Sequence, residues 1–339
     1  MGTLVESPVV FDSVDPRFPV RRTAARPSLA AVPALAASVG LAVLLAACAA
    51  PAATAPSSSS GVIDVVASTS VYGDIAKSVG GDKVSVTSII SKTSQDPHSY
   101  EASTQDKLVV SKAQLVIDNG AGYDDFFSKL ADDSKVAADK TITAVNVSGL
   151  LPAATSSASP AAVPEGFNEH VWYNFDAMAK VADAVAAKLG SLDPADAKTF
   201  TANADKFKSS LTGLSAKVAE IKSSKGSAPV AITEPVPGYL LEAAGLENKT
   251  PEEFSHAIEV GSDVPPAAVK ETSDLISSKS VRFLAYNEQT ASAETEKLKA
   301  EATAAGVPVI GFTETLPEGK DYVAWMTDNV GNVAAALNK

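Results

Sequence analysis

Four polar side chains in this 339-residue chain have the types and positions expected of ligands for a divalent metal ion. His98 lies in SQDPHSYE, the loop after the apolar run VSVTSII, and His170 follows an Ala/Pro-rich loop in NEHVWYN. Glu234 ends the run PVAITE, and Glu314 ends VPVIGFTE. Two imidazoles and two carboxylates form a set that suits a divalent first-row metal ion. Because the chain has only 3 histidines, this grouping favours a metal site.

Each of these residues also has a simpler interpretation. A lone histidine in a loop is more often exposed than a ligand, and both glutamates occur as Thr-Glu shortly before a proline, where they could simply close a βα turn. The metal-site prediction therefore depends on the joint placement. The third histidine, His256 in EEFSHAIEVG, lies in an irregular stretch, and we expect it to be exposed and outside the site.

Four further residues are candidates for a supporting layer around the ligands. Asp96 and Glu101 flank His98, and a carboxylate often accepts the second N–H of a ligating imidazole. For Asp96, a plain Asp-Pro turn is an equally good interpretation. Asn287 and Glu288 end the run VRFLAYNE and so point to the same region. We assign all four to the second shell, and Glu288 is a reserve for the fourth ligand position.

The residues that must position this set form alternating strands and helices. Short β-branched runs separated by helical stretches indicate βα units and a mostly parallel, buried sheet. In the first half of the chain these runs are VIDVVAST (62–69), VSVTSII (84–90), QLVIDNG (114–120) and TITAVNV (141–147). The segment 151–169, rich in Ala, Ser and Pro, then predicts a surface loop.

One long amphipathic helix is predicted over 193–226. Its apolar residues recur at steps of three or four, with Asp193 and Pro194 as cap and first turn: Phe200, Ala204, Phe207, Leu211, Leu214 and Val218. A coiled-coil segment is the alternative, but the heptads are too irregular for one.

The βα alternation resumes after this helix. Its strands are predicted at 229–234, 281–288 and 307–314, with a terminal helix from Tyr322 to about Leu337. The fold class is therefore α/β, with an N-terminal lobe at 62–192 and a C-terminal lobe at 227–339, each with a mostly parallel sheet, joined by the long helix. Ligands of such sheets sit at the carboxyl ends of the strands, which places the metal site in the cleft between the lobes.

The N-terminal region predicts export and a lipid anchor. A basic patch, VRRTAAR, precedes about 20 small and apolar residues that end at Cys48, the only cysteine. Residues 45–48, Leu-Ala-Ala-Cys, resemble a bacterial lipobox, in which the cysteine is acylated. We predict a signal peptide at 1–47, lipidation of Cys48 and a flexible tether at 48–61 that holds the body on the outer face of the cytoplasmic membrane. An uncleaved membrane anchor is the alternative.

The charge balance limits the possible partners. The net charge is −12, and removing residues 1–47 leaves a body near −13. Nucleic acid and anionic membrane surfaces are therefore excluded as partners, apart from membrane contact through the lipid anchor, whereas a cation is compatible.

The order PHSYE, EHVWYN, TEPVPGYLLEAAGL and FTETLPEGKDYVAWMTDNV resembles the substrate-binding proteins of manganese and zinc ABC transporters, a family with a rigid helical backbone between its lobes. The resemblance covers about residues 62–339. It implies that His98, His170, Glu234 and Glu314 are the metal ligands. It also implies a monomer that carries one divalent metal ion to an ABC transporter permease.

Two departures from the family pattern bear on the metal. Zinc-type members usually have histidine at the third ligand position, whereas Glu234 is found there, as in manganese-type members. The fourth ligand is usually aspartate, whereas the matching residue is Glu314. Carboxylate oxygens suit Mn²⁺, although the same ligands bind Zn²⁺ more tightly by intrinsic affinity. We therefore favour Mn²⁺ slightly over Zn²⁺.

The function predicted from these features is that of an extracytoplasmic solute-binding lipoprotein for metal uptake, not an enzyme. One alternative is a zinc-dependent hydrolase, since two histidines and a glutamate form a catalytic zinc set. Against it, the first two histidines are 72 residues apart in separate loops, with no HExxH helix. The other alternative is an adhesin that uses the same fold for cell adhesion.

Overall fold

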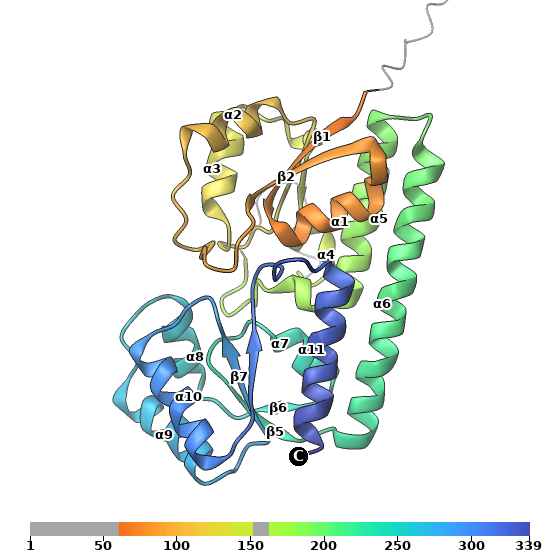
Figure 1. Ribbon diagram of the computed structural model, residues 1–339. Coiled ribbons are helices and arrows are strands. Elements are labelled where there is room, and N and C mark those ends of the chain that lie inside the picture. The colour runs from red at the N-terminus through yellow and green to blue at the C-terminus, as the bar shows by residue number, and fades with distance from the viewer. Residues whose placement is uncertain (1–60, 152–162) are drawn as a thin grey trace, which may run out of the picture. The chain divides into compact units, whose positions relative to one another are not determined.

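Two parallel β-sheets form the framework of the protein (Figure 1). The computed structural model describes residues 61–151 and 163–339. The first sheet has the order β2-β1-β3-β4 and the second β6-β5-β7-β8. Their strands are β1 Ile63–Thr69, β2 Val84–Ile90, β3 Leu115–Asp118, β4 Thr141–Thr143, β5 Pro229–Ile232, β6 Glu247–Asn248, β7 Leu284–Asn287 and β8 Val309–Phe312. The predicted α/β fold with two βα lobes is confirmed.

The apolar runs in the sequence reflect strands that are covered on both faces. Both β3 and β7 lie inside their sheets, with a parallel neighbour on each side, and all four residues of each are buried. Parallel sheets have this property because their crossover helices pack on both faces. The carboxyl ends of the strands in each sheet consequently share one edge.

The helices of the first lobe begin at residues that can cap them. In α2, Ser103 Oγ accepts from the backbone N–H of Asp106, whose carboxylate accepts from the N–H of Ser103. Asn174 caps α5 by accepting from the N–H of Ala177 at 2.9 Å. The helices are α1 Ser70–Gly80, α2 Thr104–Lys112, α3 Asp125–Asp133, α4 Ala144–Ser148 and α5 Phe175–Leu192.

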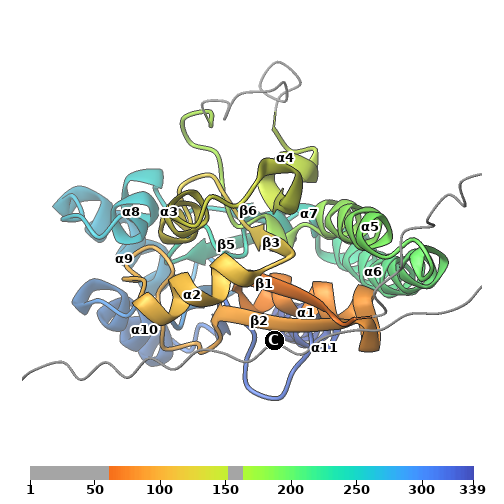
Figure 2. The ribbon, with the colours of Figure 1, turned by 90° about the horizontal axis from the view of Figure 1, so that it is seen from above.

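Helix α6, Ala197–Lys225, contacts both lobes. Its apolar stripe is buried against α1 and α5 of the first lobe and against α7 Gly238–Ala243 and α11 Tyr322–Leu337 of the second, and Figures 1 and 2 show α5 and α6 side by side. The predicted start at Asp193 is wrong. That residue ends α5, and its carboxylate accepts from Ala195 N in the turn between the two helices.

The remaining helices of the second lobe are α8 Glu252–Glu259, α9 Pro266–Ser277 and α10 Ala293–Ala305. Helix α8 corrects the expectation of an irregular stretch around His256, although that side chain is exposed as predicted. A second correction concerns 141–147, where only Thr141–Thr143 is a strand and α4 follows at once. The two-residue β6 was not predicted.

The two lobes share one hydrophobic core. A single cluster of buried side chains runs from the first sheet through α5 and α6 to α11 and the second sheet. Polar contacts tie the lobes further: Tyr322 N to Asp74 Oδ2 (2.9 Å), Leu316 N to Ser70 Oγ (3.0 Å), Tyr173 hydroxyl to Thr313 O (2.8 Å) and Tyr322 hydroxyl to Trp172 O (2.6 Å). Large rotations of one lobe against the other would break this core.

Several sequence predictions fall on residues that the structure does not describe. The signal peptide at 1–47, Cys48 and all of the tether except residue 61 lie outside the described residues, as does 152–162 of the predicted surface loop. Within the described ranges, none of the helices combines the length and apolar character needed to cross a membrane.

Replacing Leu214 tests the role of α6 in the shared core. This side chain is buried in the apolar stripe, so Leu214→Ala is expected to lower the free energy of unfolding by about 2–5 kcal/mol in urea titrations. Thr212→Ala, on the exposed face of the same helix, is the matched control and should change it by less than about 0.5 kcal/mol. Equal effects of the two substitutions would contradict the proposed packing.

Candidate metal centre

His98 is presented by a loop that Asp96 holds in shape. The two oxygens of Asp96 accept from the backbone N–H of His98 at 2.9 Å and from Ser99 Oγ at 2.7 Å. Asp96 therefore fixes the backbone of the loop, as an Asx turn does, and not the imidazole ring. Glu101 is exposed and lines a surface pocket together with His98, but within the described part of the chain it makes no hydrogen bond to His98.

His170 is buried, and its ring is oriented by Asn168. It directly precedes a 3-10 turn, Val171–Tyr173, and Nδ1 lies 2.7 Å from Asn168 Oδ1, which also accepts from the His170 backbone N–H. Because an amide oxygen can only accept, Nδ1 carries the proton and Nε2 keeps its lone pair. Burial, and then the nearby His98, lower the pKa of His170 well below its ordinary value. The ring is thus neutral, as an imidazole ligand must be, and Asn168 rather than a residue flanking His98 holds it in place.

Glu234 and Glu314 both accept hydrogen bonds from the side-chain amide of Asn287. They follow β5 and β8, and Asn287 at the end of β7 donates Nδ2–H to Glu314 Oε1 at 2.7 Å and to Glu234 Oε2 at 3.1 Å. The Thr290 hydroxyl donates to Glu234 Oε1. The adjacent carboxyl ends of β5, β7 and β8 thus bring two glutamates separated by about 80 positions to the same amide.

Both carboxyl groups are costly to ionise in the free protein. Burial raises the pKa of Glu234 to about 7, and the Asp96 carboxylate adds to the effect. Burial also raises the pKa of Glu314 to about 8, with further contributions from Glu234 and Asp96. Among residues 61–151 and 163–339, no lysine or arginine pairs with either group. A bound cation would supply the missing positive charge.

Three of the four predicted ligands converge directly. One ligand atom each from His98, His170 and Glu314 lies within 4.8 Å of the others. Glu314 Oε2 is buried without a hydrogen-bond partner, so it is free to bind an ion. Glu234 is not part of this cluster, because both of its oxygens are held by Asn287 and Thr290. It is connected to the cluster through Asn287.

The end of β7 carries a second supporting residue that sequence analysis missed. Gln289 Oε1 accepts from the backbone N–H of Glu314 at 2.6 Å and of Thr315 at 2.9 Å, and Gln289 Nε2 donates to Gln95 O at 3.1 Å. It therefore holds the backbone of one ligand and touches the loop of another. The reserve ligand Glu288 is exposed and lies over Gly311 of β8.

Aromatic rings wall the cluster on its inner side. Tyr123 packs edge-on against His98, with ring centroids 5.1 Å apart, and Trp172 packs against His170 at 5.0 Å. Both aromatic side chains are fully buried. They cover one side of each imidazole, and no sequence signal near Tyr123 marked it for this position.

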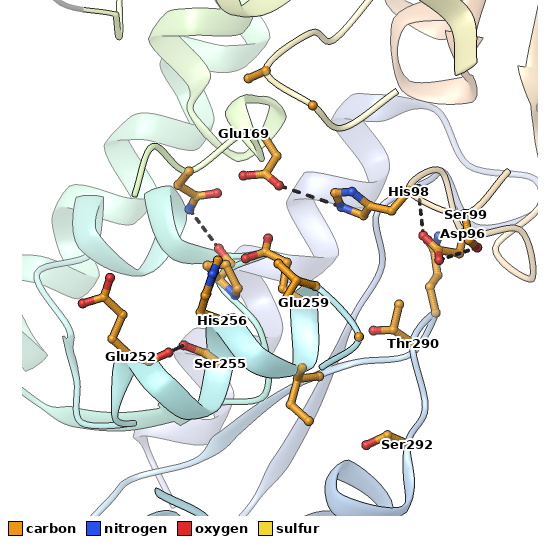
Figure 3. Close-up of a pocket in the computed structure, with 18 of the residues that line it drawn as sticks. Asp96, His98, Ser99, Glu169, Glu252, Ser255, His256, Glu259, Thr290 and Ser292 are labelled. Carbon is orange, nitrogen blue, oxygen red and sulfur yellow. Dashed lines mark hydrogen bonds and ion pairs between the residues drawn. The ribbon is translucent and has the colours of Figure 1, made fainter. Parts of the chain in front are cut away.

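A pocket of about 860 Å³ adjoins the cluster at His98 (Figure 3). His98 lines it, together with Glu169 and with Glu252, His256 and Glu259 of α8. The sequence offered only a weak signal for Glu259, its position three residues after His256. Burial, and then the Glu169 and Glu234 carboxylates, raise the pKa of Glu259 to about 9.

Comparison with known proteins extends these observations. Residues 65–336 match the family described as zinc-uptake complex component A, periplasmic. A curated relative, the manganese ABC transporter substrate-binding lipoprotein scaA of Streptococcus gordonii, is 26% identical over 316 residues, which cover 87% of this chain and 95% of that protein.

Solved structures show the same fold. The substrate-binding protein FpvC of Pseudomonas aeruginosa in complex with Mn²⁺ has a TM-score of 0.65 and 26% identity, covering 81% of this chain and 98% of that one. The periplasmic zinc-binding protein TroA of Treponema pallidum has a TM-score of 0.66 and 22% identity, covering 82% and 99%. At that identity, the second likeness supports the fold alone.

Replacing Asn168 tests whether it orients His170. Asn168→Ala removes the acceptor at Nδ1, so the affinity for Mn²⁺ or Zn²⁺ should fall about 10–100-fold in calorimetric titrations. Asn168→Asp keeps an acceptor in place and should recover most of the loss. Wild-type affinity in Asn168→Ala would show that the ring is held by its aromatic neighbours instead.

The raised carboxyl pKa values predict how stability depends on pH in the metal-free protein. Glu234 and Glu314 hold protons in the folded chain at pH values where the unfolded chain has lost them. The free energy of unfolding should therefore fall as the pH rises from about 6.5 through 8, on the order of 1 kcal/mol per pH unit for each proton that the folded chain still holds and the unfolded chain has lost, and it should level off above that range. His170 does not oppose this trend, because above a pH of about 6.5 it is neutral in both states.

Urea titrations with a chelator present measure this slope. The double variant Glu234→Gln/Glu314→Gln has no carboxyl proton to lose at either position, so its slope should be clearly smaller. An identical slope in the variant would mean that other groups cause the pH dependence.

Proposed function

The chain belongs to the family of zinc-uptake complex component A, and on that premise we propose that it is an extracytoplasmic solute-binding protein that captures a divalent transition-metal ion and delivers it to an ABC transporter permease. The metal ion is the cargo. Delivery requires no catalysis, only a site that can take up and release the ion.

The observation that carries this proposal is the convergence of His98, His170 and Glu314 within 4.8 Å. Glu234 supplies the fourth ligand once an ion draws one of its oxygens from Asn287 or Thr290. The resulting two nitrogens and two or more oxygens come from both lobes. Asp96, Asn168, Asn287 and Gln289 hold the ligands or their backbone in place.

The alternative functions are not favoured. The family and the relative scaA are named for metal transport, not for hydrolysis or adhesion. Glu288, a possible general base in a hydrolase, is exposed and lies over β8.

The identity of the ion is a finer proposal, in which we favour Mn²⁺ slightly over Zn²⁺. Two glutamates provide hard oxygen ligands, which suit Mn²⁺, and the relative scaA is named a manganese transporter component. Two imidazoles also suit Zn²⁺, which binds such sets more tightly. Which ion is transported then depends on supply as well as on affinity.

We also propose how the body is held at the membrane. Residues 1–47 act as a signal peptide, Cys48 is lipidated, and 48–61 is the tether between the lipid and the folded body. The relative scaA is named a lipoprotein, which supports this proposal. The body, with the lobes at 62–192 and 227–339, acts as a monomer on the outer face of the cytoplasmic membrane.

Metal titration of the purified protein tests the proposed function. The wild type should bind one Mn²⁺ or Zn²⁺ per chain. His98→Ala and Glu234→Ala should each weaken binding at least about 100-fold, since each removes one of four ligands. Glu271→Ala, an exposed carboxylate on α9, is the control and should have no effect.

Glu314→Gln and Glu288→Gln distinguish Glu314 from its reserve, Glu288. We expect a large loss of affinity only for Glu314→Gln, because Glu288 is exposed beside Gly311 and is not part of the cluster. Stoichiometric binding that survives both His98→Ala and Glu234→Ala would rule out this site.

A further inference from the structure

A second group of metal-binding side chains lies just outside the buried ligands. One ligand atom each from His98, Glu169 and Glu259 lies within 4.8 Å of the others, and His98 Nε2 is 3.8 Å from Glu169 Oε1. Figure 3 shows the Glu169 carboxylate pointing toward the His98 ring, with Glu259 projecting toward both from α8. These residues come from three separate segments, so the cluster is a product of the fold.

The exposure of the candidate ligands decreases from this group inward. The side chains of His98, Glu169 and Glu259 are 26%, 14% and 10% exposed, whereas His170 and Glu314 are each 1% exposed. All three outer residues line the 860 Å³ pocket, and of the four inner ligands only His98 does. An ion that enters through this pocket therefore meets the outer group first.

Glu259 faces the Glu169 carboxyl and has no lysine or arginine beside it in the described chain. Its Oε1 is buried and accepts no hydrogen bond there. His170 Nδ1, 3.7 Å away, gives its proton to Asn168 instead. A buried acceptor that lacks a donor costs free energy unless a cation or water occupies the space in front of it.

His98 belongs to both groups and can serve only one ion at a time. A neutral imidazole has a single nitrogen lone pair. An ion held by His98, Glu169 and Glu259 can move inward by exchanging the two glutamates for His170 and Glu314 while it keeps His98. At no point in that exchange does the ion lose all of its protein ligands.

We propose that His98, Glu169 and Glu259 form an outer transit site for the divalent metal ion, from which His98 passes the ion to the buried ligands. This inference rests on the proposed function and deepens it. The outer site has one nitrogen and two carboxylate groups, so it binds the same class of ion more weakly than the inner site.

Mn²⁺ titrations followed by electron paramagnetic resonance test the outer site in a background without the inner carboxylates. In Glu234→Gln/Glu314→Gln, one Mn²⁺ should still bind, about 100-fold or more weakly than in the wild type. Adding Glu169→Gln and Glu259→Gln should abolish that residual binding. Far-UV circular dichroism and thermal melting establish that the variants fold.

Association kinetics provide a second test in the intact inner site. Tryptophan fluorescence reports binding, because Trp172 packs on His170. In Glu169→Gln/Glu259→Gln the association rate for Mn²⁺ should fall about tenfold. Glu253→Gln/Glu271→Gln makes the same two side-chain changes at exposed positions that do not line the pocket, and should keep the wild-type rate.

The outcomes separate this inference from the proposed function. If the wild type binds no Mn²⁺ or Zn²⁺ stoichiometrically, or if Glu234→Gln/Glu314→Gln binds as tightly as the wild type, the proposed function or its site fails. If the wild type binds one ion but the residual binding is absent, or is unchanged by the two outer substitutions, the transit site is wrong. An association rate equal to that of the control pair also overturns it, even where the inner-site variants do not fold.

Discussion

The candidate site is built around buried glutamate carboxyl groups that have no lysine or arginine side chain beside them. Glu234, Glu259 and Glu314 converge from β5, α8 and β8, and among the described residues no lysine or arginine neutralises any of them. Such an arrangement is unfavourable in the free protein and becomes favourable when a divalent ion enters. The surrounding amides and hydroxyls reduce the cost without removing it, because dipoles stabilise a charge less than a counter-ion does.

The backbone that carries these three carboxyl groups must hold its shape although the groups repel one another when they are ionised. The shared core supports that backbone, since α6 packs against α1 and α5 on one side and α7 and α11 on the other. Hydrogen bonds such as Tyr173 to Thr313 and Tyr322 to Trp172 join the lobes close to the ligands. A large rotation of one lobe against the other during uptake or release would therefore break these contacts.

The sequence predicted the fold well because a parallel strand that is buried on both faces appears in the sequence as a continuous apolar run. It also led to the four proposed ligands, since strand ends in one sheet must share an edge. Helix boundaries were less certain: Asp193 suits a helix start but ends α5 instead. Asn168, Gln289, Tyr123 and Glu259 were missed, because their importance comes from contacts with residues distant in the chain. Asp96 lies two residues before His98 and binds the backbone N–H of that residue, not its ring. Sequence spacing alone could not distinguish these two contacts.

The contacts of Asn287 have a consequence for the ease of loading. Its Nδ2 has two hydrogens but lies within hydrogen-bonding distance of three acceptors, Glu234 Oε2, Glu314 Oε1 and Thr290 Oγ1. Two of these oxygens must therefore share one N–H group. Asn287 thus has fewer N–H groups than acceptors around it. When a metal ion takes one of these oxygens, two acceptors remain for the two N–H groups. Binding of the ion at this point therefore leaves neither N–H group of Asn287 without an acceptor.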